Sequence, residues 1–402
     1  MAAPKIKGDT AGAMPGFRWP VRGRVIAENI ASLLDLPPFD NSAVDGYAVR
    51  HRDLAATAET KLKVTGRLTA GKSAPEPISP GQAVRIFTGA PMPPGADTVF
   101  MQEDVQVEGD TVILPPGLKP GSNSRLTGED VKKGAVVLPA GRRLATQDIA
   151  LAAGIGLTRL KVRRRVRVAL FSTGDEIVEP GQPRPNASTY DANRYLLSGM
   201  LERLGATVTD LGIIKDEPAS LVKAIGEAAR TNDLVLTSGG VSTGEADYVR
   251  DAVEKVGKLV FWRVAIKPGR PVAMGVIPGS SPGTSAAFMG LPGNPVAAFV
   301  TFARVARPLL LRLAGALPEP LIALPVRLSF AYKKKSGRRE YVRVSLRRAA
   351  DGTVEAVKHP QDGAGVITSL TETDGLAEIA EEVATLEAGA TVGFLSYATL
   401  IG

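Results

Sequence analysis

Hydrophobic and polar positions follow two alternating patterns between residues 164 and 316. Short apolar runs typical of buried strands, such as VRVALF and DLVLTS, are followed by stretches with a helical repeat, such as NRYLLSGMLERLG and EPASLVKAIGEAART. Strands and helices that alternate at these lengths indicate parallel strand–helix units. The pattern therefore predicts a doubly wound, mostly parallel sheet, closed by a long helix that begins at Pro295.

The rest of the chain has a β pattern. Residues 40–127 contain short β-type runs separated by Pro and Gly, which predicts a small β domain. Residues 317–402 return to this pattern and predict a C-terminal β domain, either a barrel or a sandwich. Residues 17–39 and 128–163 together predict a connecting domain, and residues 1–16 are interpreted as a flexible tail. The expected fold class is thus multidomain α/β plus β.

Composition narrows the functional classes. The net charge of +8 over 402 residues favours anionic partners, either phosphorylated small molecules or nucleic acids. The run KKKSGRREYVR has six cations, but it lacks the interleaved aromatics of nucleic-acid platforms, so we expect no nucleic acid. The absence of cysteine excludes disulfides and thiolate metal sites, and two histidines are too few for a multi-histidine zinc site.

Apolar segments of the length that membranes require are absent. No stretch reaches the ~20 uninterrupted apolar residues of a membrane helix, and the first twenty residues lack the apolar core of a signal peptide. We therefore expect a cytoplasmic protein without a membrane partner.

Two turns that carry glycines, hydroxyls and acids follow predicted strands, in LVLTSGGVSTGEAD (234–247) and VALFSTGDE (168–176). Ligands bind at this carboxyl edge of an α/β sheet, where such turns approach phosphate closely and carboxylates hold Mg²⁺. Singly, each acid could instead be a helix cap or a solvated loop residue. The candidate residues are Ser172, Thr173, Gly174, Asp175, Glu176, Ser238, Gly239, Gly240, Ser242, Gly244 and Asp247, with Asp216 at a third strand end.

Two further turns contain cations or glycines that could bind a ligand. AIKPGRP follows a strand, and its prolines aim Lys267 and Arg270 around Gly269. A solvated surface turn fits the local sequence equally well, but the position at the ligand edge favours anion binding. In GLPGNP, Gly293 follows Pro292 and allows close approach to a ligand, and Asn294 can cap the helix that begins at the next proline.

Two short motifs suggest other activities. GRLTAGKS matches a P-loop, but three prolines follow within seven residues and forbid the helix whose N-terminus must hold the phosphate. GVSTG matches a nucleophile elbow around Ser242, but His359, in a turn of the C-terminal β domain, is the one histidine that follows it. A loop that binds phosphate is better supported than either alternative.

Several long motifs carry a resemblance to a known family. FDNSAVDGYAVR, RIFTGAPMPPGADTVFMQED, FSTGDE, TSGGVSTGEADY, AIKPGRP and GLPGNP occur in this order and resemble the molybdopterin molybdenumtransferase family, which includes MoeA and the gephyrin E domain. The resemblance runs from about residue 17 to the C-terminus. It implies an enzyme that inserts molybdenum from molybdate into adenylylated molybdopterin and releases AMP with the help of magnesium.

The resemblance also implies roles for individual residues. Glu176 and Asp247 would be the central catalytic acids and the magnesium ligands, and Asp216 a further functional acid. Asp45 and Thr88 would reach the site of the other subunit in an elongated homodimer. The sites implied to bind substrate and molybdate also include Lys267, Arg270, Arg338 and Ser369.

One departure concerns the N-terminus. The family begins with an amphipathic helix, whereas this chain has a short polar tail, which puts the stability of the dimer in question. Two alternatives stay open, a molybdopterin adenylyltransferase and a gephyrin-like scaffold without catalysis. The adenylyltransferase and acceptor molybdoenzymes are also the protein partners that the resemblance implies.

Overall fold

The computed structural model describes residues 23–72, 76–241 and 248–401. Its largest part is a six-stranded sheet in the order β14-β11-β15-β19-β18-β16. The four strands β14 (Thr207–Ile214), β11 (Arg167–Thr173), β15 (Leu234–Ser238) and β19 (Ser285–Leu291) are parallel. The remaining two, β18 (Pro271–Pro278) and β16 (Lys258–Arg263), run antiparallel to their neighbours.

Helices cover both faces of this sheet, as the doubly wound prediction requires. On one face α2 (Asn193–Arg203), α5 (Pro295–Thr301) and α6 (Arg307–Leu313) bury a core around Leu170, Leu236 and Phe302. On the other face α3 (Pro218–Thr231) and α4 (Tyr248–Val256) bury a core around Phe171, Val235 and Phe288. The predicted long helix from Pro295 is α5 and α6 joined by the π-helical η3 (Phe302–Ala306).

The C-terminal region is a closed barrel of five strands, which confirms the barrel-like prediction. The strands are β20 (Leu324–Leu328), β22 (Arg339–Arg348), β23 (Val354–Lys358), β24 (Gly375–Ile379) and β26 (Thr391–Ser396). The pairing of β22 with β24 closes the barrel. A sixth strand, β17 (Ile266–Lys267), pairs in parallel with β22, although in sequence it lies between β16 and β18 of the α/β sheet.

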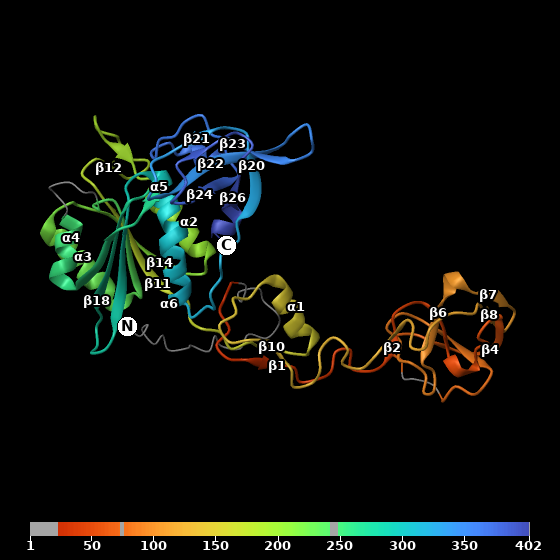
Figure 1. The fold of residues 1–402 in the computed structure, drawn as a ribbon. Helices are drawn as coiled ribbons and strands as arrows, with labels where there is room; N and C mark the ends of the chain where they lie inside the picture. Colours follow the sequence, from red (N-terminus) through yellow and green to blue (C-terminus); the bar gives the residue numbers. More distant parts are fainter. Residues whose placement is uncertain (1–22, 73–75, 242–247, 402) are drawn as a thin grey trace.

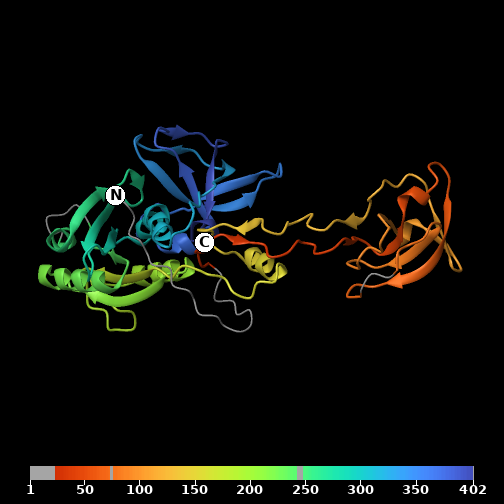
Figure 2. The same cartoon turned by 90° about the horizontal axis from the view of Figure 1, so that it is seen from below.

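The small β domain has its own six-stranded sheet, in the order β6-β3-β5-β4-β8-β7. Its strands are β3 (Gly46–Val49), β4 (Thr60–Leu68), β5 (Gln82–Ile86), β6 (Thr98–Met101), β7 (Gln106–Glu108) and β8 (Thr111–Leu114). Figures 1 and 2 show this domain at one end of an elongated molecule, far from the α/β sheet and the barrel.

A narrow connecting region links this domain to the rest of the molecule. Its strand β1 (Ile30–Ala31) pairs with β10 (Val136–Leu138), so two segments distant in sequence run side by side. With α1 (Thr146–Gly154) they enclose a small core around Ile26 and Leu144. The residues at which each domain begins and ends stay predictions.

Among the described residues, no helix is long and apolar enough to cross a membrane.

Several short elements complete the description of the fold. The short elements are β2 (Asn41–Ser42), β9 (Ser124–Arg125), β12 (Ile177–Val178), β13 (Thr189–Tyr190), β21 (Tyr332–Lys333), β25 (Thr385–Leu386), α7 (Thr368–Thr371), α8 (Tyr397–Ile401) and the 3₁₀ turns η1 (His51–Asp53) and η2 (Gln102–Asp104).

Candidate functional site

A cavity of about 620 Å³ lies at the carboxyl ends of the parallel strands β11, β14, β15 and β19. The structure brings most of the predicted turn residues together around it. The predicted residues that line the cavity are Ser172, Thr173, Gly174, Glu176, Asp216, Ser238, Gly239, Gly240, Gly293 and Asn294. Gly365 and Ile367 come from the barrel, so one wall of the cavity belongs to the C-terminal region.

The turn after β15 has a backbone conformation that only glycine adopts readily. Gly239 and Gly240 have φ angles of +92° and +65°, in the left-handed region. A Cβ on Gly239 would lie 2.3 Å from the Thr173 carbonyl oxygen, and one on Gly240 would lie 2.4 Å from Val249 Cγ2. The Gly239 N–H donates to the Leu291 carbonyl at 3.0 Å, so this turn is fixed to the start of the LPGNP turn.

Asn193, a residue that sequence reasoning missed, ties the two turns together. Its amide nitrogen donates to Ser238 Oγ at 2.8 Å and to the Gly293 carbonyl at 2.6 Å. The side chain is 7% exposed, and its Oδ1 is buried with no hydrogen-bond partner among the described residues. From sequence, an Asn at the start of a helix is most simply interpreted as a cap, so its contacts with the two distant turns could not be predicted.

Asn294 does not act as sequence reasoning expected. It occupies the N-cap position of α5, but its side chain makes no capping hydrogen bond within the described part of the chain. Instead the Val296 N–H donates to the Ala364 carbonyl of the barrel at 3.0 Å. A carbonyl of the barrel loop thus accepts the hydrogen bond from a helix N-terminal N–H that a capping side chain would otherwise accept.

Carboxylates crowd the edge of the cavity. Burial raises the pKa of Asp216, and the negative charges of Asp175 and Glu176 raise that pKa further. The Thr173 hydroxyl donates to Asp216 Oδ1 at 3.4 Å, which only partly offsets these effects. A bound cation would reduce the repulsion between these carboxylates. Within the described residues, however, no three carboxylates or histidines are grouped closely enough to hold a metal by themselves.

Three predicted residues fall outside the described part of the chain, namely Ser242, Gly244 and Asp247. Their roles stay predictions.

Buried Arg194 fixes the segment that follows Glu176. Its guanidinium pairs with Asp191 at 3.0 Å and with Glu179 and Asp210. Glu179 follows β12 and Asp191 follows β13, and since the two strands are parallel, one side chain holds the carboxyl ends of both. The N-terminal turn of α2 therefore supports two walls of the cavity, one through Asn193 and one through Arg194.

The predicted cations lie outside the cavity lining. Lys267, on β17, pairs with the buried carboxylate of Glu340 at 3.2 Å, which also accepts from the Tyr332 hydroxyl at 2.7 Å. Gly269 has a φ of +107°, and a Cβ there would lie 2.4 Å from Thr301 Cγ2, so the turn that carries Lys267 and Arg270 packs tightly on α5. Neither Arg270 nor Pro292 lines the cavity.

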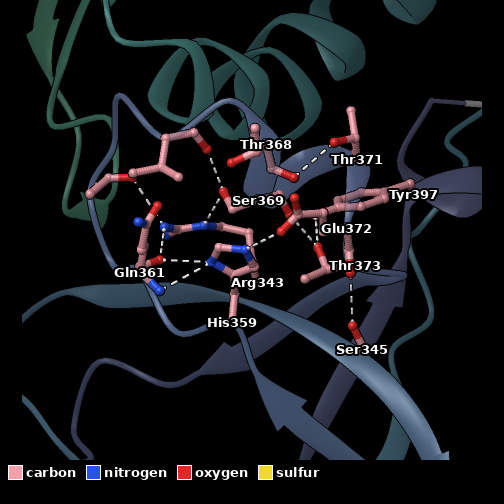
Figure 3. Close-up of polar contacts among 12 residues, drawn as sticks. Arg343, Ser345, His359, Gln361, Thr368, Ser369, Thr371, Glu372, Thr373 and Tyr397 are labelled. Carbon is pink, nitrogen blue, oxygen red and sulfur yellow. Dashed lines mark hydrogen bonds and ion pairs between the residues drawn. The ribbon is translucent and has the colours of Figure 1, made fainter.

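Arg338 and Ser369 lie in the C-terminal region in different environments. Arg338 is half-buried just before β22, and its carbonyl accepts from Lys334 Nζ at 2.7 Å. Ser369 is fully buried in the network of Figure 3, where its hydroxyl donates to the Val366 carbonyl at 2.6 Å and accepts from Arg343 Nε at 3.1 Å. Its hydroxyl is thus already engaged within the protein.

His359 belongs to the same network. Its Nε2 lies 2.9 Å from Oε2 of Glu372, whose side chain is exposed. Because Ser242 lies outside the described residues, the rejection of a serine-hydrolase triad stays a prediction.

Asp45 and Thr88 lie together in the distant β domain. The backbone N–H and the hydroxyl of Thr88 donate to Asp45 Oδ1 at 2.8 and 2.9 Å. The backbone hydrogen bond first, and the hydroxyl second, lower the pKa of Asp45. The acid is thus held ionised and oriented, but in the β domain, which lies at the other end of the molecule from the α/β sheet (Figure 1).

Three family models match the chain in order. They are the MoeA N-terminal region (domain I and II) over residues 13–156, the "Probable molybdopterin binding domain" over 169–312 and the MoeA C-terminal region (domain IV) over 325–397.

Curated and solved relatives agree with these matches. The molybdopterin molybdenumtransferase of Haemophilus influenzae is 39% identical over 384 residues, 94% of this chain and 92% of that protein. That of Nostoc sp. is 38% identical over 366 residues, 89% of this chain and 83% of that protein. The crystal structure of the molybdopterin biosynthesis MoeA protein of Pyrococcus horikoshii OT3 is similar with a TM-score of 0.74 at 29% identity, covering 94% of this chain and 92% of that one.

The fold, the cavity and these relatives define a transferase of molybdenum cofactor biosynthesis. The chain belongs to the molybdopterin molybdenumtransferase family.

Proposed function

We propose that this protein transfers molybdenum from molybdate to adenylylated molybdopterin and releases AMP. One observation carries the proposal, namely the cavity that combines glycine turns, hydroxyls and acids at the carboxyl edge of the sheet. Backbone N–H groups and the Ser172 and Ser238 hydroxyls would bind the phosphates, and the Thr173 hydroxyl would join them by exchanging its bond to Asp216. Such groups suit a phosphoanhydride because they carry no negative charge of their own.

Magnesium fits the acids at the edge of this cavity. Burial raises the pKa of Asp216 most, and repulsion by Asp175 and Glu176 raises it further; a divalent cation would remove this repulsion. Since the described carboxylates do not enclose a metal alone, substrate phosphates would complete its coordination, as is usual for Mg²⁺. We propose Glu176 and Asp247 as its protein ligands. The ion would supply positive charge against the phosphoanhydride as it is cleaved.

Molybdate would reach the site through the cations next to the barrel. Lys267 is half-exposed and held by the buried Glu340 carboxylate, so its charge has a defined position. Arg270 and Arg338 would add positive charge at the same side. For Ser369 a direct contact with molybdate would require its hydroxyl to exchange its bond to Val366.

Asp45 and Thr88 would act in a second copy of the chain. The elongated shape places them far from their own cavity, whereas an antiparallel homodimer would bring the β domain of one subunit to the cavity of the other (Figure 2). Co-expression tests this arrangement. Asp45→Asn and Glu176→Gln subunits should each be inactive alone, and mixed dimers should regain activity because one of the two sites is then intact. Mixed dimers as inactive as the parents would contradict action between subunits.

The reaction itself is tested with purified full-length protein, adenylylated molybdopterin, molybdate and Mg²⁺, with AMP measured by chromatography. Glu176→Gln should abolish AMP release, while Glu227→Gln, an exposed acid on α3, should leave it unchanged. If both variants release AMP at the wild-type rate, the assignment of Glu176 fails. Formation of adenylylated product from molybdopterin and ATP would instead indicate the adenylyltransferase reaction.

A further inference from the structure

A row of basic and aromatic side chains crosses three strands of the β domain. Tyr47 on β3 lies opposite Arg85 on β5, and Arg85 lies opposite Arg67 on β4. The Arg85 guanidinium lies 5.0 Å from the ring centroid of Tyr47 and 4.8 Å from that of Phe87. The Arg67 guanidinium also lies 4.8 Å from the Phe87 centroid. One aromatic ring thus holds two positive charges near each other.

Arg67 and Arg85 are register partners on the parallel strands β4 and β5, and like charges at neighbouring positions on one face of a sheet repel each other. Stacking on Phe87 orients both guanidinium groups without neutralising them. Arg85 donates to the Gly46 carbonyl at 3.1 Å and to the Gln102 side chain, and both acceptors are uncharged. Among the residues the structure describes, neither arginine forms an ion pair with a carboxylate. At longer range, the charge of Arg85 adds to the two Thr88 hydrogen bonds that lower the pKa of Asp45. The row therefore keeps a fixed positive charge that Asp45 balances only in part.

This charge lies beside the Asp45–Thr88 pair. Gly46, whose carbonyl Arg85 contacts, directly follows Asp45, and Thr88 directly follows Phe87. The Oδ1 of Asp45 is already engaged by two bonds from Thr88. Arg67 and Thr88 are exposed, so the row opens to solvent at this end of the domain.

We propose that Arg67 and Arg85 form an oxyanion-binding subsite that takes a phosphate group of a small-molecule ligand beside Asp45 and Thr88. Planar guanidinium groups with fixed orientation bind phosphate through paired N–H donors. The identity of that ligand as the phosphorylated substrate held by the second subunit rests on the proposed function. The existence of the subsite does not.

The subsite is tested locally by arginine modification of the full-length protein. Phenylglyoxal labelling followed by peptide mass spectrometry gives a rate for each arginine, with inorganic pyrophosphate or AMP as the probe. Pyrophosphate should slow labelling of Arg67 and Arg85 at least about fivefold, while exposed Arg52 in the same domain keeps its rate. Equal rates with and without both probes would overturn the proposal. Protection by AMP but not by pyrophosphate would also overturn it, because the subsite would then not recognise phosphate.

Kinetics of two matched variants separate this proposal from the proposed function. Arg67→Gln should raise the KM for adenylylated molybdopterin about tenfold, because it removes a charged phosphate contact, whereas Arg52→Gln should not. Arg67 is preferred to Arg85 because Arg85 also holds the Gly46 carbonyl. If the wild type releases no AMP but pyrophosphate protects both arginines, the proposed function fails and the subsite stands. If the wild type is active and the two variants have equal KM, the subsite fails alone.

Discussion

Replacement of Asn193 by Asp is the most direct test of how the cavity is held together. The two side chains have nearly the same shape, so the change exchanges an amide nitrogen for an oxygen and adds a charge. That nitrogen now donates to Ser238 Oγ and to the Gly293 carbonyl. The carbonyl can only accept, so an Asp oxygen placed 2.6 Å from it would be repelled.

The magnitude follows from the bonds lost. Two hydrogen bonds of ~0.5–1.5 kcal/mol each give about 1–3 kcal/mol, and a buried carboxylate facing a carbonyl adds to this cost. We expect the free energy of unfolding to fall by about 3 kcal/mol. If the displaced turns lower the binding free energy of a cavity ligand by half of that amount, its affinity falls about tenfold.

Asn232 provides a matched control. Its amide nitrogen also donates to one backbone carbonyl, of Ala228 at 3.0 Å, and to one hydroxyl, of Thr231 at 3.1 Å. It precedes β15, at the opposite edge of the sheet from the cavity. Asn232→Asp should therefore lower stability without changing ligand affinity.

Urea unfolding and titration calorimetry with AMP, well below the melting temperature, measure the two quantities separately. The reasoning is refuted if Asn193→Asp and Asn232→Asp bind AMP with equal affinity, or if Asn193→Asp is as stable as the wild type. Rescue of AMP binding by Asn193→Gln would also refute it, because the longer side chain cannot place its nitrogen at both acceptors.

Three further variants test other parts of the site. The raised pKa of Asp216 means that its protonation favours the folded state, so Asp216→Asn should stabilise the unliganded protein at pH 7, by up to about 1 kcal/mol for a half-buried acid. In thermal scans this advantage should shrink as the pH falls and vanish by about pH 3, below the ordinary pKa of an Asp in the unfolded chain; a constant difference at all pH values would contradict it. Arg194→Met leaves Asp191 buried and unpaired and should cost about 3–5 kcal/mol in urea unfolding, with partial recovery when Asp191→Asn is added. Gly239→Ala should cost more than Gly212→Ala by over about 1 kcal/mol, because both glycines have positive φ but only Gly239 meets a backbone oxygen; equal melting temperatures would exclude this account.

Much of the fold could be predicted because its signals are local. The apolar runs that became β11 and β15 and the helical repeats that became α2 and α3 each lie within about fifteen residues of sequence. Glycine placement was equally informative, since Gly239 and Gly240 need conformations that other residues avoid. The shared edge of parallel strands then predicted that Thr173, Asp216 and Ser238 would meet.

What the sequence concealed depends on contacts between distant segments. Asn193 is 45 residues from Ser238 and 100 from Gly293, and nothing in its local sequence indicates either partner. The missing cap of Asn294 has the same cause, because a loop of the barrel supplies the acceptor. The Arg67–Arg85 pair becomes visible only when the register of β4 and β5 is known.

The path of β17 has a consequence for how the molecule unfolds. The chain leaves the α/β sheet after β16, adds two residues to the barrel sheet and then returns as β18. One segment of the α/β region is therefore part of the barrel sheet. The barrel and the α/β sheet cannot separate unless the pairing of Ile266 with Arg339 breaks. We expect them to melt as one cooperative block, while the β domain, joined by two thin segments, melts as an independent second block. A fragment that ends before the barrel would be an incomplete structure and not a domain in its own right.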